Sequence, residues 1–505
     1  MSAPTFDLGS LHGGLRLDAR KSASTRNPIR DMPVPGQLVL PLAQHVGEPA
    51  QPVVSPGEKV RKGQLIAEQP DALGAPVHAS SSGTVVAIEP WPIVRRLGDT
   101  APCIVIETDG RDAALEEHTA SLDFESMSPD ELAAEILAGG IVGLGGAVFP
   151  TAQKLEQAFT NRLDFLLLNG VECEPYISCD DVLMRESAAA VLEGGRILMR
   201  VLGLDSCIVA VESDKPEALD ALELALESSP DRRMTLKQIP TIYPSGGEDQ
   251  LVQLVTGREV PSGGLPSDVG CLVQNVGTAV AVADWILRRE PLISRVTTVT
   301  GDGVAAPGNI RVRLGTTVAD VIEFAGGYTD SIRSLVIGGP MTGRSVTTDR
   351  VPVVKATNCI LVLGETPDPG PERPCIRCGY CADVCPVSLL PQQLYWYACA
   401  DDESQLRAYG LTDCIECGCC DLVCPSHIPL TSDFRTAKAR IRELDDEKAR
   451  AERARRRFEA RSERLERERI EREEELEAQK TKARAAGPET IAEILARGKR
   501  KKDRD

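Results

Sequence analysis

Two copies of one cysteine pattern constrain the fold of this chain more than any other feature of its sequence. In each copy the spacing is Cys-x2-Cys-x2-Cys-x3-Cys, and proline follows the fourth cysteine. The short spacings let three thiolates of one loop face three corners of a cubane cluster, while the fourth starts away toward a neighbouring cluster. The pattern therefore predicts a small helical domain that holds two 4Fe-4S clusters. The cysteines are Cys375, Cys378, Cys381 and Cys385, then Cys414, Cys417, Cys420 and Cys424.

We expect each cluster to take three cysteines from one copy and the last cysteine from the other. The alternative is a pair of zinc ribbons, but zinc sites need two CxxC knuckles and leave the third cysteine and the Cys-Pro step unexplained. Crossed ligation gives one cluster Cys375, Cys378, Cys381 and Cys424, and gives the other Cys385, Cys414, Cys417 and Cys420.

The overall composition predicts a soluble acidic protein of several domains. The chain has 505 residues with a net charge of −18, and 42% of its residues are hydrophobic. An acidic body disfavours nucleic acid as a partner. No uncharged apolar stretch approaches the roughly 18 to 20 residues of a membrane span, and the opening MSAPTFDLGS lacks the features of a signal peptide. We therefore expect a reducing compartment, where metal ligation explains the grouped cysteines better than disulfides do.

Residues 1–127 form the first predicted region, with a β domain over about 37–108. Short β segments broken by turns occur there, and the pair VSPGEKVRKGQLIAE and APVHASSSGTVVAI resembles the barrel-sandwich fold of biotinyl and lipoyl domains. The expected hairpin tip, residues 69–74, contains no lysine that could carry such a group. The fold is expected without the swinging-arm function.

Residues 128–290 alternate helical and strand patterns. The first helix is expected to begin at Ser128-Pro129-Asp130-Glu131, which has capping-box spacing with proline at the first helical position. Buried strands over 163–168 and 207–211 flank an amphipathic helix over 182–202 that ends at Gly203. This alternation predicts a Rossmann-like α/β domain with a largely parallel sheet.

The rest of the chain divides into three further predicted parts. Residues 291–365 return to β structure with one helix and resemble the β-grasp, soluble-ligand-binding module. A Pro-rich linker opens the helical two-cluster ferredoxin domain over 366–433, and this linker suggests that the domain is a separable module. Residues 434–505 hold 24 basic and 18 acidic residues of alternating sign, which predicts a long polar helix.

A glycine-rich loop opens a helix early in the α/β domain. It contains Gly143, Gly145 and Gly146, and Lys154 lies on the helix that follows. Backbone amides at such a helix start, together with a lysine, can hold a phosphate. The spacing differs from the dinucleotide pattern GxGxxG, so a simple tight turn is the alternative.

Polar residues emerge where the strand over 163–168 ends. Asn169, Glu172 and Glu174 follow it directly, at the carboxyl end of a strand, where α/β sheets place ligands. Acidic groups there suit ribityl or ribose hydroxyls and the edge atoms of a flavin. Two carboxylates in a turn also need polar partners if they are buried.

These residues carry a family resemblance. GLGGAVFPTAQKL followed by LLLNGVECEPYISCDDVLMRE resembles the C subunits of the Rnf complex, the ion-translocating ferredoxin:NAD oxidoreductase, and more distantly the flavin-bearing NADH-binding subunit of respiratory complex I. The likeness covers roughly residues 10 to 430. In the same family a Gly-Glu-Glu turn and an Asn-containing turn each precede a helix. Gly247, Glu248 and Asp249 hold the first place here, and Asn275 and Thr278 lie in the second.

The resemblance implies a noncovalent FMN in the α/β domain, with NADH docking over its ring. It makes Glu172, Glu174 and Phe149 the candidate catalytic residues, with Phe149 as a stacking face, although burial in the core is the ordinary role of a phenylalanine. The cofactor contacts that it implies are Gly143, Gly145, Gly146, Lys154, Asn169, Glu172, Glu174, Gly247, Glu248, Asn275 and Thr278.

The function that the resemblance implies is electron transfer between NAD(H) and ferredoxin through FMN and two 4Fe-4S clusters. The chain would be a peripheral subunit on the cytoplasmic side of the bacterial inner membrane, beside membrane-spanning and iron-sulfur partner subunits that move the ion. One alternative is a soluble NADH diaphorase subunit that feeds a hydrogenase or reductase. The other is a scaffold without enzymatic activity, in which the clusters are structural.

Overall fold

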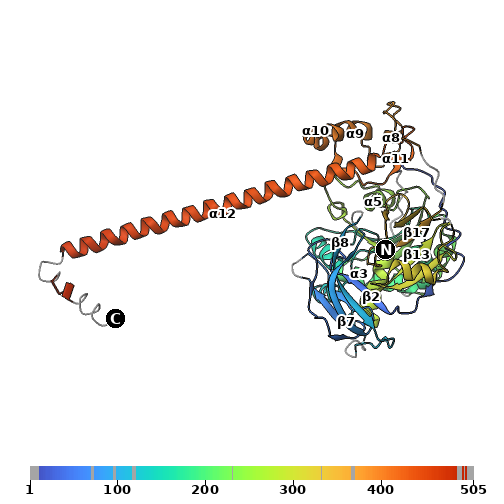
Figure 1. Ribbon diagram of the computed structural model, residues 1–505, viewed down its shortest axis with the longest axis horizontal. Coiled ribbons are helices and arrows are strands. Elements are labelled where there is room, and N and C mark those ends of the chain that lie inside the picture. Colours follow the sequence, from blue (N-terminus) through green and yellow to red (C-terminus); the bar gives the residue numbers. More distant parts are fainter. Residues whose placement is uncertain are drawn as a thin grey trace. The chain divides into compact units, whose positions relative to one another are not determined.

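The computed structural model describes residues 11–69, 73–94, 98–115, 121–229, 231–330, 332–364, 370–485, 492–493 and 495–496 (Figure 1). It divides into two units, residues 1–434 and 435–505. The first unit contains all four predicted folded regions. The cysteine-rich segment is therefore packed with the domains before it, and its removal without unfolding them stays a prediction.

The N-terminal β domain consists of two small sheets. One has the strand order β2-β8-β7-β4 and the other the order β3-β5-β6. In β2, Leu38 and Leu40 face the main core, while Val39 packs on the other face of the sheet with Cys103 and Val105. This alternation is the period of two that a strand requires. Residues 70–72 of the predicted hairpin tip lie outside the described residues. The bounds are β2 Gln37–Pro41, β3 Gln51–Pro52, β4 Lys59–Val60, β5 Leu65–Glu68, β6 Val77–His78, β7 Gly83–Pro92 and β8 Thr100–Thr108.

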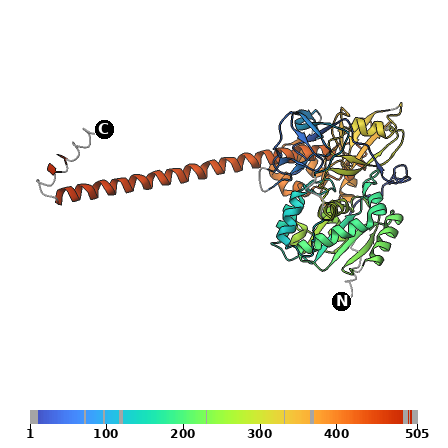
Figure 2. The same cartoon turned by 90° about the horizontal axis from the view of Figure 1, so that it is seen from below.

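The α/β domain has a parallel four-stranded sheet, as the sequence predicts, and its strand order is β11-β10-β9-β12. It is the green region of Figure 2, where helices lie beside the strands. Leu166 and Leu168 of β9 face the helix α3 side, whereas Leu167 packs with the apolar residues of α5. Both faces are thus covered, which explains the uninterrupted apolar run at Phe165 to Leu168 of β9. The strands are β9 Phe165–Gly170, β10 Cys207–Glu212, β11 Met234–Ile239 and β12 Cys271–Asn275.

The helices of this domain begin and end close to the sequence signals. Ser128 and Glu131 form the predicted capping box at α1, and Gly203 ends α3 in the left-handed conformation. Asn275 caps α6 by accepting a hydrogen bond from the backbone of Gly277. The bounds are α1 Pro129–Ala138, α2 Thr151–Ala158, α3 Cys179–Leu202, α4 Pro216–Ser228, α5 Glu248–Thr256, η1 Pro266–Val269 and α6 Val276–Arg288.

The β-grasp region forms a six-stranded mixed sheet with the order β1-β14-β13-β17-β15-β16. Its edge strand β1, Arg30–Asp31, comes from the N-terminal region and pairs in parallel with β14. Residues 30–31 therefore belong to this sheet and not to the β domain that follows them in sequence. The other elements are β13 Ser294–Thr300, β14 Gly308–Arg313, α7 Val318–Phe324, β15 Ser334–Ile337, β16 Arg344–Val346 and β17 Cys359–Leu363.

The cysteine-rich segment repeats one backbone conformation. Gly379 and Gly418 hold equivalent places in the two copies, and both have positive φ, 87° and 76°. Arg377 and Glu416, one step before the second cysteine, both have φ of 56°. The sequence repeat is thus a structural repeat. Its elements are α8 Tyr380–Asp383, α9 Pro391–Cys399, α10 Glu403–Ala408, η2 Leu411–Asp413 and α11 Cys419–Leu422.

The long polar helix is α12, Leu430–Ala485, which is drawn in orange and red in Figure 1. Its side chains over 451–485 are all exposed. None of the helices in the described parts of the chain combines the length and the apolar character that a membrane crossing needs.

Candidate functional site

A cavity of about 450 Å³, hereafter the large cavity, lies at the carboxyl ends of the parallel strands. Such a place and size are usual for a small-molecule site in an α/β fold. Residues from six separate parts of the sequence reach it. Its lining includes Leu144 and Gly145, Asn169 and Glu172 to Glu174, Asp180, Tyr243 and Pro244, Gly246 to Gln250, Asn275, Thr342, Asn358, Ile415 and Cys417.

The glycine-rich loop is held in place by the protein. The backbone N–H of Gly143 donates to the Phe149 carbonyl over 2.8 Å, which closes the loop. The Leu144 N–H donates over 2.9 Å to the hydroxyl of Thr278, a fully buried residue. Thr278 therefore holds the glycine-rich loop in place. Leu144 and Gly145 of that loop line the large cavity.

Lys154 has two acceptors within the protein. Its ammonium group is 2.5 Å from a Glu248 carboxylate oxygen and 2.7 Å from the Val273 carbonyl. Glu248 lines the large cavity, and the described residues of the lining do not include Lys154. The lysine thus neutralises an acidic residue at the start of α5, and the phosphate contact predicted for it would require this ion pair to open.

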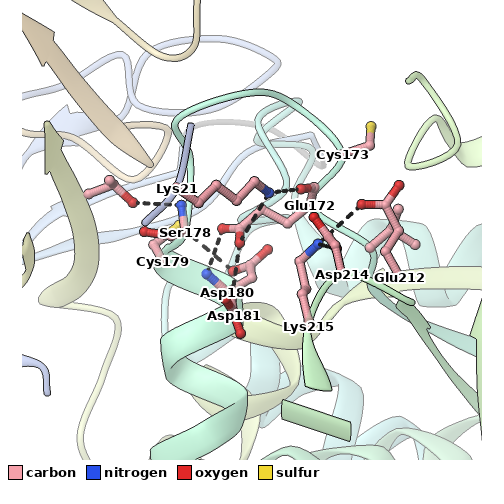
Figure 3. A network of polar contacts seen from close by, with 12 residues as sticks. Lys21, Glu172, Cys173, Ser178, Cys179, Asp180, Asp181, Glu212, Asp214 and Lys215 are labelled. Atoms are coloured by element: carbon pink, nitrogen blue, oxygen red, sulfur yellow. Dashed lines mark hydrogen bonds and ion pairs between the residues drawn. The ribbon is translucent and has the colours of Figure 1, made fainter. Parts of the chain in front are cut away.

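Glu172 binds the start of helix α3 (Figure 3). Its carboxylate accepts hydrogen bonds from the backbone N–H groups of Asp180, at 2.7 Å, and Asp181, at 3.1 Å. The Lys21 ammonium group donates to the Glu172 carbonyl and lies 3.9 Å from its carboxylate. A negative charge is favourable at a helix N-terminus, and it replaces the side-chain cap that Ser178 does not make. The sequence analysis expects polar partners for buried carboxylates in this turn. For Glu172 these partners are groups of the protein itself.

Glu174 connects the α/β domain to the β-grasp region. One carboxylate oxygen accepts the backbone N–H groups of Met341, at 2.9 Å, and Thr342, at 2.8 Å, while the other is 2.5 Å from the Thr342 hydroxyl. A Cβ at Gly339 would lie 2.3 Å from Glu174, so this loop approaches closely only because glycine stands there. Glu174 thus positions one wall of the large cavity.

A buried ion pair positions the wall that contains Tyr243. Lys215 and Glu212 are 3.1 Å apart and almost completely buried, and Asp214 lies 2.8 Å from the same ammonium group (Figure 3). The Ser245 hydroxyl donates to the second Glu212 oxygen over 2.8 Å. Attraction to Glu212 and Asp214 keeps Lys215 charged despite its burial and raises its pKa. The loop over 243–247 is therefore anchored to the end of β10.

Asp180, another residue of the lining, has an unusual environment. Burial, followed by repulsion from Glu172, raises the pKa of Asp180 to about 7. The Asn275 amide donates to its carboxylate over 2.6 Å. Glu172, Cys179 and Asp180 bring their potential metal-ligating atoms within 4.8 Å of one another, but the Glu172 carboxylate already accepts two helix N–H groups. Asp180 also lines a second cavity of about 330 Å³ together with the buried Arg295.

The first cysteine loop, residues 375–385, encloses a small cavity with the end of the second loop, residues 414–424. Cys375, Cys378, Cys381 and Cys424 all line it. These are the four residues that crossed ligation assigns to one cluster. None of the cysteines in the described residues forms a disulfide.

The second cysteine loop lies against the large cavity. Cys417 lines that cavity, and the Tyr243 hydroxyl donates to its carbonyl over 2.7 Å. Burial raises the pKa of Cys385, and the nearby Cys417 adds to this effect. Cys385, the last cysteine of the first copy, therefore reaches the neighbourhood of the second loop.

The structure brings most of the predicted cofactor contacts together. Seven of them line the large cavity: Gly145, Asn169, Glu172, Glu174, Gly247, Glu248 and Asn275. Among the described residues of the lining, Gly143, Gly146, Phe149, Lys154 and Thr278 are not found. Of these, Gly143 and Thr278 shape the glycine loop, and the stacking role of the half-buried Phe149 stays a prediction.

Several residues of the site were not predicted from the sequence. Lys21 reaches the site from the N-terminal region, and the Met341–Thr342 loop comes from the β-grasp region. Cys173, which lies outside the two cysteine quartets, also lines the large cavity. The contacts of Lys21 and of the Met341–Thr342 loop join positions more than 140 residues apart, so local spacing alone could not reveal them.

Three family models match separate parts of the chain. The RnfC barrel sandwich hybrid domain matches residues 9–111, the Nuo51 FMN-binding domain matches residues 136–284, and the SLBB domain matches residues 296–345. Their order is the order of the first three folded regions. The FMN-binding match includes the glycine loop, the Asn169–Glu174 turn and the start of α5.

Curated relatives match over nearly the whole chain. A protein of Pseudomonas aeruginosa, named as the C subunit of an ion-translocating oxidoreductase complex, is 49% identical over 90% of this chain and 59% of its own length. Proteins of the same name from Haemophilus influenzae (strain 86-028NP) and Cronobacter sakazakii are 43% and 42% identical, over 69% and 63% of their own lengths. This chain thus spans roughly three fifths to two thirds of the length of these relatives.

Among solved structures, a crystal structure of an NAD+-reducing [NiFe]-hydrogenase matches with a TM-score of 0.45 and 22% identity, over 61% of this chain and 63% of that one. Similarity at this level says nothing about function. The curated relatives carry the assignment, because identities above 40% extend over 90% of the chain. This chain belongs to the family of the C subunits of the ion-translocating oxidoreductase complex, the Rnf complex.

Proposed function

We propose that this chain is the NADH- and FMN-binding iron-sulfur subunit of a membrane-bound, ion-translocating complex that passes electrons between NAD(H) and ferredoxin. One observation carries the proposal. The large cavity is lined at the same time by the glycine loop, by the Asn169–Glu174 turn and by Cys417 of the second cysteine loop. A flavin nucleotide in this cavity would lie beside a cluster ligand.

The residues around the large cavity fit a flavin nucleotide. The cavity volume of about 450 Å³ suits a ligand of that size. Gly145 and Gly247 present backbone without a Cβ on two walls, and Glu172 and Glu174 are fixed by their own hydrogen bonds. We assign the FMN contacts to the seven predicted residues that line the cavity, with Lys154 behind Glu248.

The cysteines fit two 4Fe-4S clusters with crossed ligands. The support is the cavity shared by Cys375, Cys378, Cys381 and Cys424, together with the position of Cys385 near Cys417. FMN held in the large cavity would supply two-electron hydride chemistry with NADH and one-electron exchange with clusters held by the cysteines. Glu172, Glu174 and the Lys215–Glu212 pair fix the cavity walls through their own hydrogen bonds and ion pair.

The remaining parts of the proposal concern the assembly. Membrane-spanning and iron-sulfur subunits of the same complex would move the ion and exchange electrons with ferredoxin. This chain would lie on the cytoplasmic side of the inner membrane. The family name supports a complex of several subunits.

The test uses the full chain prepared without oxygen. We expect about one FMN and on the order of eight iron atoms per chain, with NADH reducing an artificial dye. Added to membranes that lack the native subunit, the chain should restore NADH-linked ferredoxin turnover. A preparation that takes up neither flavin nor iron under reconstitution would contradict the proposal.

A further inference from the structure

The described N-terminus of the chain, residues 11–15, runs between the large cavity and the cysteine-rich segment. On one side, Leu15 and Tyr243 exchange two backbone hydrogen bonds of 2.7 and 2.8 Å. On the other side, the Gly14 N–H donates to the Val384 carbonyl over 3.0 Å. Val384 directly precedes Cys385. The segment therefore bridges a wall of the cavity and a predicted cluster ligand through the main chain.

Both bridging contacts need glycine. Gly13 has a φ of 62°, and a Cβ there would lie 2.8 Å from backbone atoms of Val384 and Cys385. Gly14 has a φ of 76°, and its Cβ would lie 2.8 Å from the Tyr243 carbonyl. Positive φ and close backbone approach are the two conditions that favour glycine over any other residue. A larger residue would push the three backbone segments apart.

Tyr243 completes the connection to the second cysteine loop. The residue is only 4% exposed, and its hydroxyl donates to the Cys417 carbonyl over 2.7 Å. The Ser262 hydroxyl makes a further contact of 2.7 Å with Asp413, next to Cys414. Cys385, Cys414 and Cys417 are three of the four predicted ligands of one cluster. By contrast, the described lining of the cavity at the first loop consists entirely of residues from 375 to 430.

We propose that residues Gly13 to Leu15 form a strap which, with Tyr243 as its anchor, fixes the second-loop cluster in place beside the large cavity. This proposal rests on the proposed function. It names residues that would affect electron transfer by positioning the cluster. Gly13, Gly14 and Tyr243 are positioning residues: they touch the backbone of the cysteine loops and set the geometry and hydrogen bonding around the cluster. Hydrogen bonding near cluster sulfurs tunes the reduction potential, and a shift of about 1 Å suffices to slow a reaction strongly.

Two variants test the strap, each with little other change. Tyr243→Phe removes the hydroxyl and keeps the ring. Gly14→Ala introduces the Cβ that meets the Tyr243 carbonyl. Gly110→Ala is the matched control, because Gly110 has a similar φ of 70° but no atom within 4 Å of the added Cβ. It reproduces the backbone strain without the crowding.

The first measurement uses the full, anaerobically loaded chain. In Tyr243→Phe and Gly14→Ala we expect unchanged FMN and iron, a shifted reduction potential and electron paramagnetic resonance signal for the cluster that Cys417→Ala removes, and an unshifted second cluster. Reduction of the clusters by NADH should slow by about tenfold or more. Gly110→Ala should match the wild type. Wild-type signals and rates in both strap variants, or an equal shift of both clusters, would overturn the proposal.

The second measurement does not depend on cofactors, so that a failed strap can be told from a failed assignment of function. Amide hydrogen exchange is compared in protein without flavin or iron. Faster exchange over residues 384–389 and 413–420 in Gly14→Ala, but not in Gly110→Ala, would support the strap even if the chain bound no FMN. Equal exchange in both variants would refute it.

Discussion

The two cysteine loops have the same backbone but different surroundings. At equivalent positions the first loop has Tyr380, which is 56% exposed, and the second has Cys419, which is fully buried. Ile376 and Ile415 show the same contrast, at 67% and 36% exposed. The first loop lies at the surface, whereas the second packs between Tyr243 and the Met341 loop. A repeated motif thus gives the same local chemistry twice, and the neighbours decide which copy serves the large cavity.

The contrast assigns the two predicted clusters different places in electron transfer. Cys417 of the second loop lines the large cavity, whereas Ile376 and Tyr380 of the first loop are exposed. A cluster on the second loop would therefore lie beside the cavity, and one on the first loop would lie toward the surface. The small Cys419 explains how the second loop can approach, because a tyrosine at that position would separate the backbones. Variants of single residues can break or sharpen this distinction.

The largest effect is expected from replacing the last cysteine of either loop by alanine. Cys385→Ala should remove the cluster beside the large cavity, although Cys385 belongs to the first loop in sequence. Cys424→Ala should remove the outer cluster, although Cys424 belongs to the second loop. Each variant should lose on the order of four iron atoms. Reduction by NADH should then be blocked at the flavin in Cys385→Ala, while Cys424→Ala should still reduce its remaining cluster. If electron paramagnetic resonance showed that Cys385→Ala removes the first-loop cluster and Cys424→Ala the second-loop cluster, crossed ligation would be refuted. The distinction between the two clusters drawn from it would then fail as well.

A moderate effect is expected from Glu174→Gln. Glu174 accepts three hydrogen bonds from the Met341–Thr342 loop, and a hydrogen bond to a charged group contributes about 1.5 to 3 kcal/mol. A glutamine keeps one carbonyl oxygen for the two backbone N–H groups but loses the negative charge, and its NH2 group faces the Thr342 hydroxyl in place of an acceptor, so the loop should loosen. Because the Met341 carbonyl approaches Gly418, we expect faster amide exchange at 414–420 and unchanged exchange at 375–381. Equal acceleration at both loops would show that Glu174 acts on global stability only.

A smaller effect is expected from Asp180→Asn, and it depends on pH. Asp180 faces Glu172, Lys21, Cys179, Arg295 and Asn275, and its pKa of about 7 lies above the ordinary value of 3.8. Between these two values the folded protein binds more protons than the unfolded chain, so stability falls as pH rises. Asparagine removes this loss and still accepts the Asn275 amide.

The measurement is the melting temperature of both proteins at about pH 5.5 and pH 8. The advantage of Asp180→Asn over the wild type should increase at the higher pH. The described lining of the cavity at the first loop contains no acidic side chain. For substitutions in that lining we therefore expect the same change in melting temperature at both pH values. Parallel curves for wild type and variant would contradict the raised pKa.

The sequence predicted the parts of this molecule that depend on local spacing. Cys-x2-Cys spacings, the capping box at Ser128 and the glycine end of α3 each involve residues a few positions apart, and the two helix signals appear as expected. The parallel sheet followed from the alternation of elements. The chemistry of Glu172 was less predictable, because its partners are helix N–H groups that exist only after α3 has folded.

What sequence reasoning missed depends on packing between distant segments. Lys154 resembles a phosphate ligand because it follows a glycine loop, yet Glu248 and Val273, about 100 residues away, accept its hydrogen bonds. The place of β1 in the β-grasp sheet could not be predicted, because two residues carry too little pattern to reveal a sheet partner. The strap glycines were invisible for the same reason: their need for glycine arises from Val384 and Tyr243.

The smallest effect is expected from removing the polar helix, which neither cysteine loop needs for its cofactor. A cut after Asp433 is too early, because Phe434 is only 1% exposed. From residue 451 to 485 every side chain is exposed, so truncation after Arg450 removes no buried group among the described residues. Ion pairs along this part, such as Arg456 with Glu452, link neighbours on the helix and contribute about 0.5 kcal/mol each at most. We therefore expect unchanged flavin, iron and melting temperature in the truncated chain, measured by absorbance, metal analysis and calorimetry. Loss of either cluster would mean that the helix stabilises the cysteine-rich segment, and loss of the outer one alone would make the two loops differ in a second way.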